Sequence, residues 1–346
     1  MDSYDATLSR MPRLHNDVDA NPGNYRMLSG ERPTGRLHLG HLFGSVLERV
    51  RLQNKGIETF IILADYQVIT DRDTSANVKN NVAEAILDYL AAGIDPAKTT
   101  IFTHSSVPAL NQLLLPFLSL VTDSELRRNP TVKSDLEASD RPLSGLLLTY
   151  PVHQAADILF CKGNLVPVGK DNLPHVEITR TIARRFNERY GHVFREPEAM
   201  VTETPEVPGI DGRKMSKSYG NAIALGMNED ETTRLIRKAR TDSDPHISFD
   251  PEQRPGVSAL LTTAAFCSGS TPQAIADELG DAGSGALKAT TAEAVNEFLS
   301  EHRSRRRQLE ADKTYVDGIL AEGNDRANAI ADSTLAEVRA AMGMDY

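Results

Sequence analysis

Short apolar runs recur along the first two thirds of the chain and are separated by longer segments with apolar residues at helical spacing. The runs at residues 25–29, 59–64, 99–103 and 165–168 are typical of strands. The amphipathic segments that alternate with them predict helices at 41–53, 75–92, 108–120, from about 143, and at 172–189. This order predicts an α/β domain, a Rossmann-like parallel sheet covered by helices, with ligands at the carboxyl ends of the strands.

The strand signals fade after residue 221, and the rest of the chain is helical in pattern. Helices are predicted at 230–240, 257–266, 272–279, 292–311 and 324–342. We therefore expect a nucleotide-binding catalytic domain at 25–220 and an all-helical domain at 221–346. Residues 1–24 are polar and contain Pro12, Pro22 and Gly23, so we expect them to form a flexible extension.

Composition narrows the class of protein. The chain has 346 residues and is 40% hydrophobic, enough for more than one domain with a sizeable core. Cys161 and Cys267 form no Cys-x-x-Cys pair, which argues against a disulfide framework or a structural zinc site. The N-terminus lacks a secretory signal pattern and no apolar run is long enough to span a membrane. We expect a soluble cytoplasmic enzyme without a protein-bound metal.

Two donor-rich loops carry the chemistry. The first contains Gly30, Pro33, Gly35 and the motif His38-Leu39-Gly40-His41 at the start of a predicted helix, where free backbone N–H groups attract phosphate. No Gly-x-x-x-x-Gly-Lys-Ser/Thr or Gly-x-Gly-x-x-Gly motif is present, which leaves the common NTPase and dehydrogenase interpretations without their main support.

The second loop lies far downstream and complements the first. Lys214-Met215-Ser216-Lys217-Ser218 is flanked by glycines and provides two ammonium groups and two hydroxyls. Such a segment is suited to close over a triphosphate and to stabilise departing pyrophosphate.

Both loops resemble the two defining motifs of class I aminoacyl-tRNA synthetases, His-Ile-Gly-His and Lys-Met-Ser-Lys-Ser, in the correct order. The segments 147–159 and 165–180 further resemble tryptophanyl-tRNA synthetases, and the similarity runs from about residue 25 to about 344. It implies ATP-dependent activation of L-tryptophan and transfer to the 2'-hydroxyl of tRNA(Trp), with Mg²⁺ accompanying ATP. It also implies a homodimer, with 108–120 as a candidate interface, and no role for DNA.

The resemblance also assigns residues. Catalysis is expected from His38, His41, Lys214 and Lys217, which stabilise charge without a covalent nucleophile. The expected ATP-binding residues are Glu31, Arg32, Thr34, Gly40, His41, Gly169, Asp171, Lys214, Met215, Ser216, Lys217 and Ser218. The expected tryptophan-binding residues are Ser29, Gly30, Gln67, Tyr150, Gln154, Asp157, Val166 and Val168.

Asp157 is the expected determinant of specificity. In the family the corresponding carboxylate accepts the indole N–H, and a buried acceptor left unpaired by another ring costs free energy. A helix cap or a structural ion pair is the alternative role for Asp157. Val166 and Val168 are equally compatible with core packing.

Some residues depart from the common bacterial tryptophanyl pattern. These enzymes usually carry Thr-Ile-Gly-Asn at 38–41, Met at Gln154 and Asp-Gln-His at 65–67. The combination found here resembles the auxiliary, second tryptophanyl enzymes of some bacteria.

The net charge is −10, yet arginines and lysines cluster in places. The helical domain is where the family holds the tRNA anticodon, and its last helix commonly packs back on the catalytic domain. A solvated helix face is the plainer explanation of any single cluster. The clusters are Arg127/Arg128, Arg180/Arg184/Arg185/Arg189, Arg234/Arg237/Lys238/Arg240 and Arg303/Arg305/Arg306/Arg307.

Two alternative functions remain at this stage. A tyrosyl enzyme shares the fold and both loops, and Tyr150, Gln154 and Asp157 are able to bind a phenol. The second alternative is an adenylating paralogue that acts as a regulator or partner of other enzymes.

Overall fold

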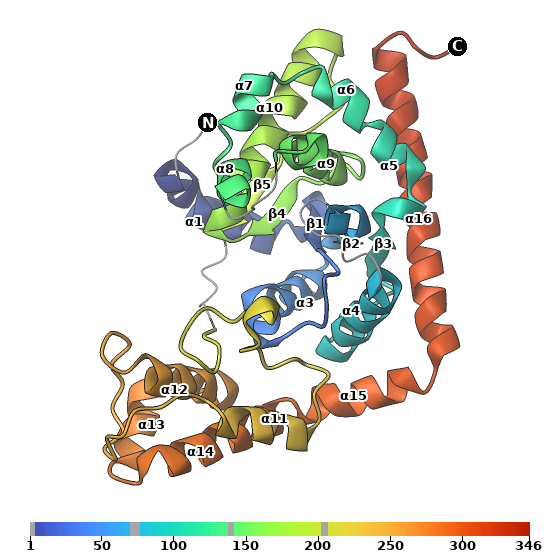
Figure 1. The fold of residues 1–346 in the computed structure, drawn as a ribbon. Coiled ribbons are helices and arrows are strands. Elements are labelled where there is room, and N and C mark those ends of the chain that lie inside the picture. The colour runs from blue at the N-terminus through green and yellow to red at the C-terminus, as the bar shows by residue number, and fades with distance from the viewer. Residues whose placement is uncertain (1–3, 70–76, 138–141, 202–206) are drawn as a thin grey trace.

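The protein is built on a five-stranded parallel sheet. The computed structural model describes residues 4–69, 77–137, 142–201 and 207–346, without the side chains of Asp135, Asp171 and Ser218. The strand order is β3-β2-β1-β4-β5, and each neighbouring pair is parallel (Figure 1). The strands are β1 (Arg26–Glu31), β2 (Glu58–Leu63), β3 (Thr99–Thr103), β4 (Leu165–Val168) and β5 (Glu198–Val201). The predicted parallel α/β sheet is confirmed, although the edge strand β5 was not predicted.

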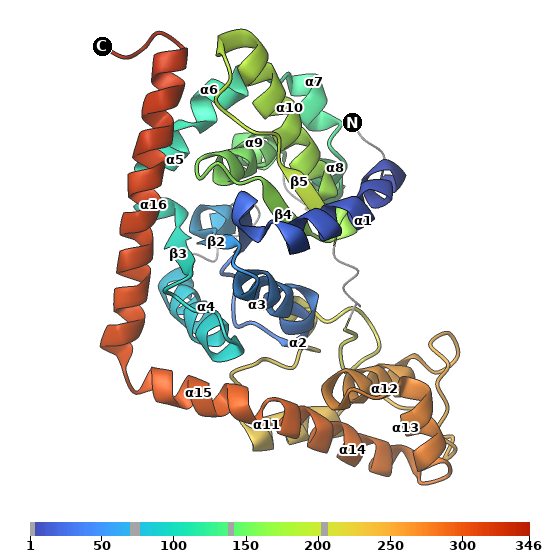
Figure 2. The ribbon, with the colours of Figure 1, turned by 180° about the vertical axis from the view of Figure 1, so that it is seen from behind.

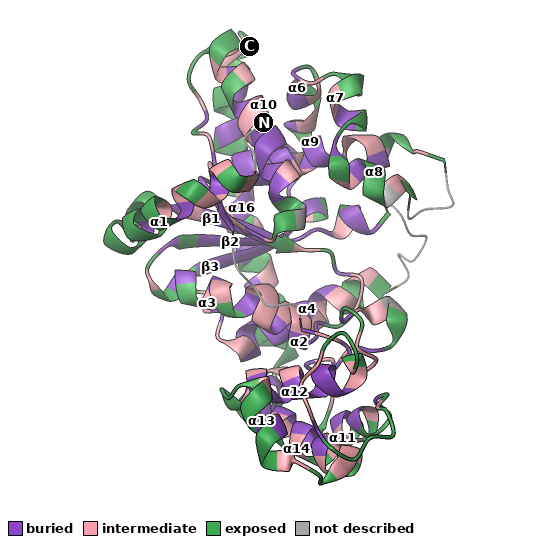
Figure 3. Ribbon diagram, turned by 90° about the vertical axis from the view of Figure 1, so that its left-hand side faces the viewer, coloured by how far each residue is buried: buried purple, intermediate pink, exposed green. Residues whose placement is uncertain are grey.

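Helices cover both faces of the sheet because the inner strands are apolar on both sides. Along β2, Ile61 joins one core cluster with residues of α3 and α4, whereas Phe60 joins a second cluster with residues of α9 and α10. Figure 3 shows the strands buried between these layers. The helices of this part are α2 (Leu39–His41), α3 (Leu47–Asn54), α4 (Val78–Ala92), α5 (Pro108–Gln112), α6 (Leu114–Leu118), α7 (Asp123–Arg127), α8 (Pro130–Glu137), α9 (Gly145–Leu159) and α10 (Leu173–Tyr190).

The predicted helix at 108–120 is divided into α5 and α6 at Leu113. Pro116 explains the break, because it has no backbone N–H to donate to the carbonyl of Gln112 and its ring crowds that group. The predicted helix at 292–311 is also two helices, which meet at Leu299.

The expectation of a flexible N-terminal extension is wrong for residues 4–24. Residues Tyr4–Ala20 form α1, and Met11 and Val18 are buried in a cluster with Met27 of β1 and Met200 of β5. Spaced apolar residues in a mostly polar sequence supply enough contact to hold this helix against the sheet edge, although Pro12 lies within it.

In the C-terminal part, the regular elements among the residues described are helices, apart from an isolated bridge between Ala224 and His38. Helices α11 to α14 lie below the sheet in Figure 1, and α15 and α16 lead away from them. The helices are α11 (Glu229–Arg237), α12 (Pro255–Ser268), α13 (Pro272–Leu279), α14 (Gly283–Phe298), α15 (Ser300–Glu310) and α16 (Lys313–Ala341).

The last helix, α16, runs back along the sheet beside β3 (Figure 2). Gly323 allows this approach, since a Cβ there would lie 1.8 Å from the carbonyl oxygen of Ile101. The Oδ1 atom of Asn324 accepts a hydrogen bond of 3.1 Å from the backbone N–H of Thr103. The helical part is thus anchored on the part that contains the sheet through its final element.

Within the described residues, none of the helices combines the length and apolar character needed to cross a membrane.

Candidate active site

The turn after β1 places two imidazole rings side by side at the start of a helix. His38 precedes α2, and its backbone N–H donates to Nδ1 of His41 over 3.2 Å. The neutral His41 ring therefore carries its proton on Nε2, which lies 3.6 Å from Oε1 of Glu31. The two ring centroids are 3.7 Å apart.

Both rings are held neutral. Burial, the neighbouring His41 ring and the Lys217 ammonium lower the pKa of His38 to about 3. Burial, Lys217 and Arg49 likewise lower the pKa of His41 to about 3. Near pH 7 each ring is therefore a neutral N–H donor that adds no full charge to the site.

The downstream loop meets this turn directly. Lys217 Nζ donates to the carbonyl oxygen of Gly35 over 2.9 Å. Gly35 has φ +151°, and a Cβ there would lie 3.3 Å from Lys217 Cδ, so glycine suits both the backbone and the contact. Met215 is buried in the core cluster that also holds Leu39 and Leu42. The two motifs predicted from the sequence are therefore brought together.

Backbone hydrogen bonds join the segments that flank the two motifs. The N–H of Leu39 donates to Ile223 over 3.0 Å, and the N–H of Leu225 donates to Leu37 over 2.9 Å. These bonds fix the segment after the Lys217 loop to the segment around His38.

Asn221 organises the downstream loop and was missed in the sequence. Its side chain is buried, accepts from the backbone N–H of Ser216 over 2.8 Å and donates to the carbonyl of Lys214 and to Asp211. A Cβ on Gly209 would lie 2.2 Å from Asn221 Nδ2. Gly209, which precedes the motif, was the available sequence signal, because only a residue without a Cβ permits this close contact with Asn221.

Arg49 supports the first loop and was also missed. The buried guanidinium donates to the Gly30 carbonyl over 3.1 Å and to the Tyr89 hydroxyl over 2.9 Å, and it lies 3.5 Å from Oε2 of Glu31. Glu31, an expected ATP-binding residue, therefore lies between Arg49 and His41.

The other expected ATP-binding residues occupy varied positions. Arg32 and Lys214 are exposed, whereas Thr34, Gly40, Ser216 and Lys217 are partly buried. Gly169 follows β4 and has open space where a Cβ would project. The side chains of Asp171 and Ser218 lie outside what the structure describes.

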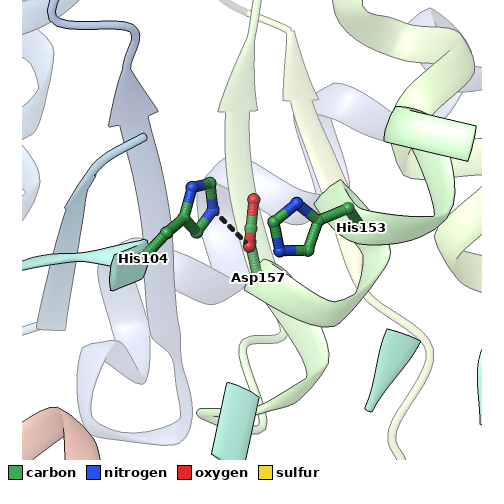
Figure 4. Close-up of side chains that lie close together, drawn as sticks. All are labelled: His104, His153 and Asp157. Carbon is green, nitrogen blue, oxygen red and sulfur yellow. Dashed lines mark hydrogen bonds and ion pairs between the residues drawn. The ribbon is translucent and has the colours of Figure 1, made fainter. Parts of the chain in front are cut away.

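A second cluster surrounds Asp157 on α9. Asp157 is 3% exposed, and its Oδ1 lies 2.8 Å from Nε2 of the buried His104. His104 comes directly after β3, and His153 approaches from α9, as Figure 4 shows. The rings of His104 and His153 are stacked, with centroids 4.5 Å apart.

The hydrogen bonds of His153 reach two further elements. Its Nδ1 lies 3.1 Å from Nε2 of Gln67, and its Nε2 lies 2.8 Å from Oδ1 of Asn111. Burial lowers the pKa of His153, so the ring is neutral with one donor and one acceptor. His104, His153 and Asn111 were missed because 42 positions separate Asn111 from His153. For His104, the place directly after the strand at 99–103 was the available signal.

Atoms of His104, His153 and Asp157 lie within 4.8 Å of one another, a spacing compatible with a metal ion. Both ring nitrogens of His153 are engaged by amide side chains, however, and His104 already contacts the carboxylate. We therefore interpret the trio as a hydrogen-bonded network.

The remaining expected tryptophan-binding residues lie on α9, β4 and β1. Tyr150 lies two turns before Asp157 on α9, and its ring centroid is 5.4 Å from that of His175. Val166 and Val168 of β4 are buried in the core cluster that includes α9 residues. Ser29 is buried on β1, and a Cβ on Gly30 would lie 2.4 Å from Ile62. Gln154 is partly buried on α9.

Comparison with known proteins identifies the family of the chain. Residues 21–300 match the model of the family "tRNA synthetases class I (W and Y)". A tryptophan–tRNA ligase of Clostridium longisporum is 40% identical over 92% of this chain and 97% of its own length. A tryptophan–tRNA ligase of Thermotoga maritima is 39% identical over 93% of this chain and all of its own.

Comparison with solved structures leads to the same family. The tryptophanyl-tRNA synthetase of Campylobacter jejuni, complexed with ADP and tryptophan, superposes with a TM-score of 0.81 and 31% identity, over 92% of this chain and 99% of that one. A tyrosyl-tRNA synthetase of Archaeoglobus fulgidus, with a TM-score of 0.63 and 22% identity over 85% of this chain and 94% of that one, shares the fold. With both loop motifs joined in space and this match over most of its length, the chain belongs to the class I aminoacyl-tRNA synthetase family of the tryptophan and tyrosine enzymes.

Proposed function

We propose that this protein is a tryptophan–tRNA ligase. The observation that carries the proposal is the hydrogen bond from Lys217 to Gly35, because it brings the two nucleotide-binding motifs of the family into one site. The similarity to tryptophan enzymes over more than nine tenths of the chain favours tryptophan over tyrosine. The tyrosyl neighbour supports the fold alone.

The first step activates the amino acid. The tryptophan carboxylate attacks the α-phosphorus of ATP in line and pyrophosphate departs. The neutral N–H groups of His38 and His41 stabilise the charge that spreads over the phosphate oxygens, and the ammonium groups of Lys214 and Lys217 hold pyrophosphate. Mg²⁺ carried by ATP, rather than by a protein ligand, would neutralise part of the phosphate charge. Positioning and electrostatics provide the rate enhancement, without a covalent intermediate on the protein.

Specificity rests on Asp157 in this proposal. Its buried carboxylate lies on α9 and accepts the indole N–H of the substrate. Phenylalanine lacks that donor and leaves the carboxylate unpaired. An unpaired buried polar group costs about 1–3 kcal/mol, and a charged group costs more. Tyr150, Gln154 and Gln67 complete the polar lining, and Val166 and Val168 complete the apolar lining.

The second step transfers the aminoacyl group to the 2'-hydroxyl of the terminal adenosine of tRNA(Trp). We assign tRNA contact to the helical part, and the structure narrows the candidate basic clusters. Arg303 and Arg306 are buried and paired with Thr232, Asn296, Asp88 and Glu84, so only Arg305 and Arg307 of this cluster are exposed. The four basic residues around the end of α11 are all exposed: Arg234, Arg237, Lys238 and Arg240.

Assembly and location complete the proposal. We assign a homodimer, with α5 and α6 as the candidate interface, where Leu115 is 77% exposed. A cytoplasmic location fits two cysteines without a disulfide between them, since Cys161 and Cys267 are free.

Amino-acid-dependent exchange of pyrophosphate into ATP tests the activation step. We expect exchange with tryptophan and not with tyrosine or phenylalanine. Charging of tRNA(Trp) then separates a translational enzyme from an adenylating paralogue. Exchange with tyrosine, or none with any of the three, would refute the substrate assignment.

A further inference from the structure

The carboxylate assigned to substrate recognition is already held by the protein. Oδ1 of Asp157 lies 2.8 Å from Nε2 of His104, and both side chains are almost fully buried. A carboxylate accepts hydrogen bonds, so the His104 proton must be on Nε2. Among the residues that the structure describes, no hydrogen bond is found to Oδ2 of Asp157, and Nδ1 of His104 has no partner. One oxygen is therefore fixed and the other remains available as an acceptor.

The His104 ring is itself held from several sides. Asn111 donates to the His104 backbone carbonyl over 2.8 Å. The ring is stacked between His153, at 4.5 Å between centroids, and Tyr66, at 6.1 Å. The ring therefore has little freedom to rotate away from Asp157.

A chain of amide and imidazole groups fixes the neighbouring ring in turn. Asn111 uses Nδ2 to donate to the carbonyls of His104 and Val107, which identifies its Oδ1 as an acceptor. His153 must therefore donate from Nε2, and its Nδ1 accepts from Nε2 of Gln67. These hydrogen bonds hold the His153 ring in place against the His104 ring, and the Nε2 amide group of Gln67 points to Nδ1 of His153.

We infer that His104 is the positioning residue that sets tryptophan specificity, because its Nε2–H clamps Oδ1 of Asp157 and leaves Oδ2 aimed to accept the indole N–H. The inference rests on the proposed function and adds to it a residue that never touches the substrate. Fixing the carboxylate in advance removes the cost of orienting it when tryptophan binds. It also keeps a charged acceptor in a dry site, where a ring without an N–H donor is penalised most.

The test compares tryptophan with an analogue in which sulfur replaces the indole N–H, 3-(benzothienyl)alanine. Exchange of pyrophosphate is measured with both, and the ratio of their kcat/KM values reports recognition of the N–H group alone. We expect the unsubstituted enzyme to prefer tryptophan by roughly 100-fold. In His104→Leu, which removes the clamp, this preference falls roughly tenfold, mainly through KM for tryptophan.

Two further variants keep the result interpretable. His104→Gln retains a side-chain N–H donor and is expected to recover part of the preference, and it covers the case in which His104→Leu does not fold. His246→Leu is the matched control, since His246 and Asp281 form a similar pair at 2.8 Å on the exposed surface. We expect it to leave the preference unchanged.

The outcomes separate the inference from the proposed function. An unchanged preference in both His104 variants, even with lower activity toward both amino acids, would show a purely structural ion pair and overturn the inference. Absence of tryptophan-dependent exchange in the unsubstituted enzyme would instead overturn the proposed function, and the inference with it.

Discussion

The nucleotide loops and the Asp157 cluster use similar side chains in opposite ways. At the loops, the imidazole, carboxylate and ammonium groups come from distant parts of the chain, and backbone contacts such as Lys217 to Gly35 bring them together. Nδ1 of His38 is buried there without a partner among the described residues. Around Asp157, side chains bond to one another before any ligand arrives.

The difference shows how each region is prepared for its ligand. A triphosphate brings its own charge, so the loops need donors that await it and rings kept neutral by burial. An amino acid side chain brings a single N–H group, so its acceptor must be fixed in advance to discriminate. The comparison predicts different failures when each region is altered.

The largest effect is expected from Asp157→Ala. The variant removes the acceptor and leaves buried His104 unpaired, so kcat/KM for tryptophan in the exchange assay should fall roughly 100-fold or more. KM for ATP should change little, because the loops lie on other elements. A comparable rise in KM for ATP would break the distinction between the two regions.

Lys217→Ala is expected to damage the other region. It removes both the Gly35 contact and a cation near the departing pyrophosphate, so the rate of adenylate formation should fall by roughly 10²-fold. The measurement is a single-turnover experiment with saturating tryptophan. Lys214→Ala is the matched variant, and we expect a smaller loss because Lys214 is exposed. An equal fall in the rate of adenylate formation in both variants would contradict a distinct role for Lys217.

Asn221→Ala should have a smaller effect on the same loop. Its side chain holds Ser216 and Lys214 through backbone groups, and the loss of these bonds loosens the loop without removing a charge. We expect KM for ATP to rise roughly tenfold while the preference for tryptophan over its sulfur analogue is unchanged. A change in that preference would show that the regions are coupled.

The smallest effect is expected from pH between 8 and 6. His38 and His41 have pKa values lowered to about 3, so the exchange rate should show no titration of these rings near 6.5.

The same lowered pKa values predict a change in stability. The two rings bind protons less readily in the native than in the unfolded protein, so the free energy of unfolding falls as pH decreases from about 6.5 toward 3. Urea unfolding at pH 7, 6 and 5 measures this. A double His38→Gln, His41→Gln variant should lose stability less steeply, and an equal slope would contradict the assignment.

The sequence predicted the parallel sheet and both loops because their signals are local. Apolar runs identified four strands, and the motifs around His38 and Lys217 are short contiguous sequences that can be recognised without a structure. Strand β5 (Glu198–Val201) was missed because Glu198 and Ala199 have low strand propensity, whereas β4, of the same length, contains Val166 and Val168. Helix α1 was missed because its buried residues, such as Met11, are sparse in a polar sequence.

The rest depended on tertiary contacts that a linear pattern does not contain. Arg306 looked like part of a basic surface, yet Asp88 and Glu84, more than 200 positions earlier, enclose it. His104 directly follows a predicted strand, but its role became visible only through its hydrogen bond with Asp157. Prediction succeeded where a role follows from neighbours in sequence and failed where it follows from neighbours in space.

The position of α16 also bears on how the protein avoids aggregation. Strand β3 is one edge of the sheet, and an uncovered edge strand is a template for pairing with another chain. Asn324 takes the N–H of Thr103, and Arg326 donates to the carbonyls of Pro96 and Thr99. The final helix therefore covers this edge and occupies a backbone group at each end of β3, which hinders the addition of a strand from a second molecule.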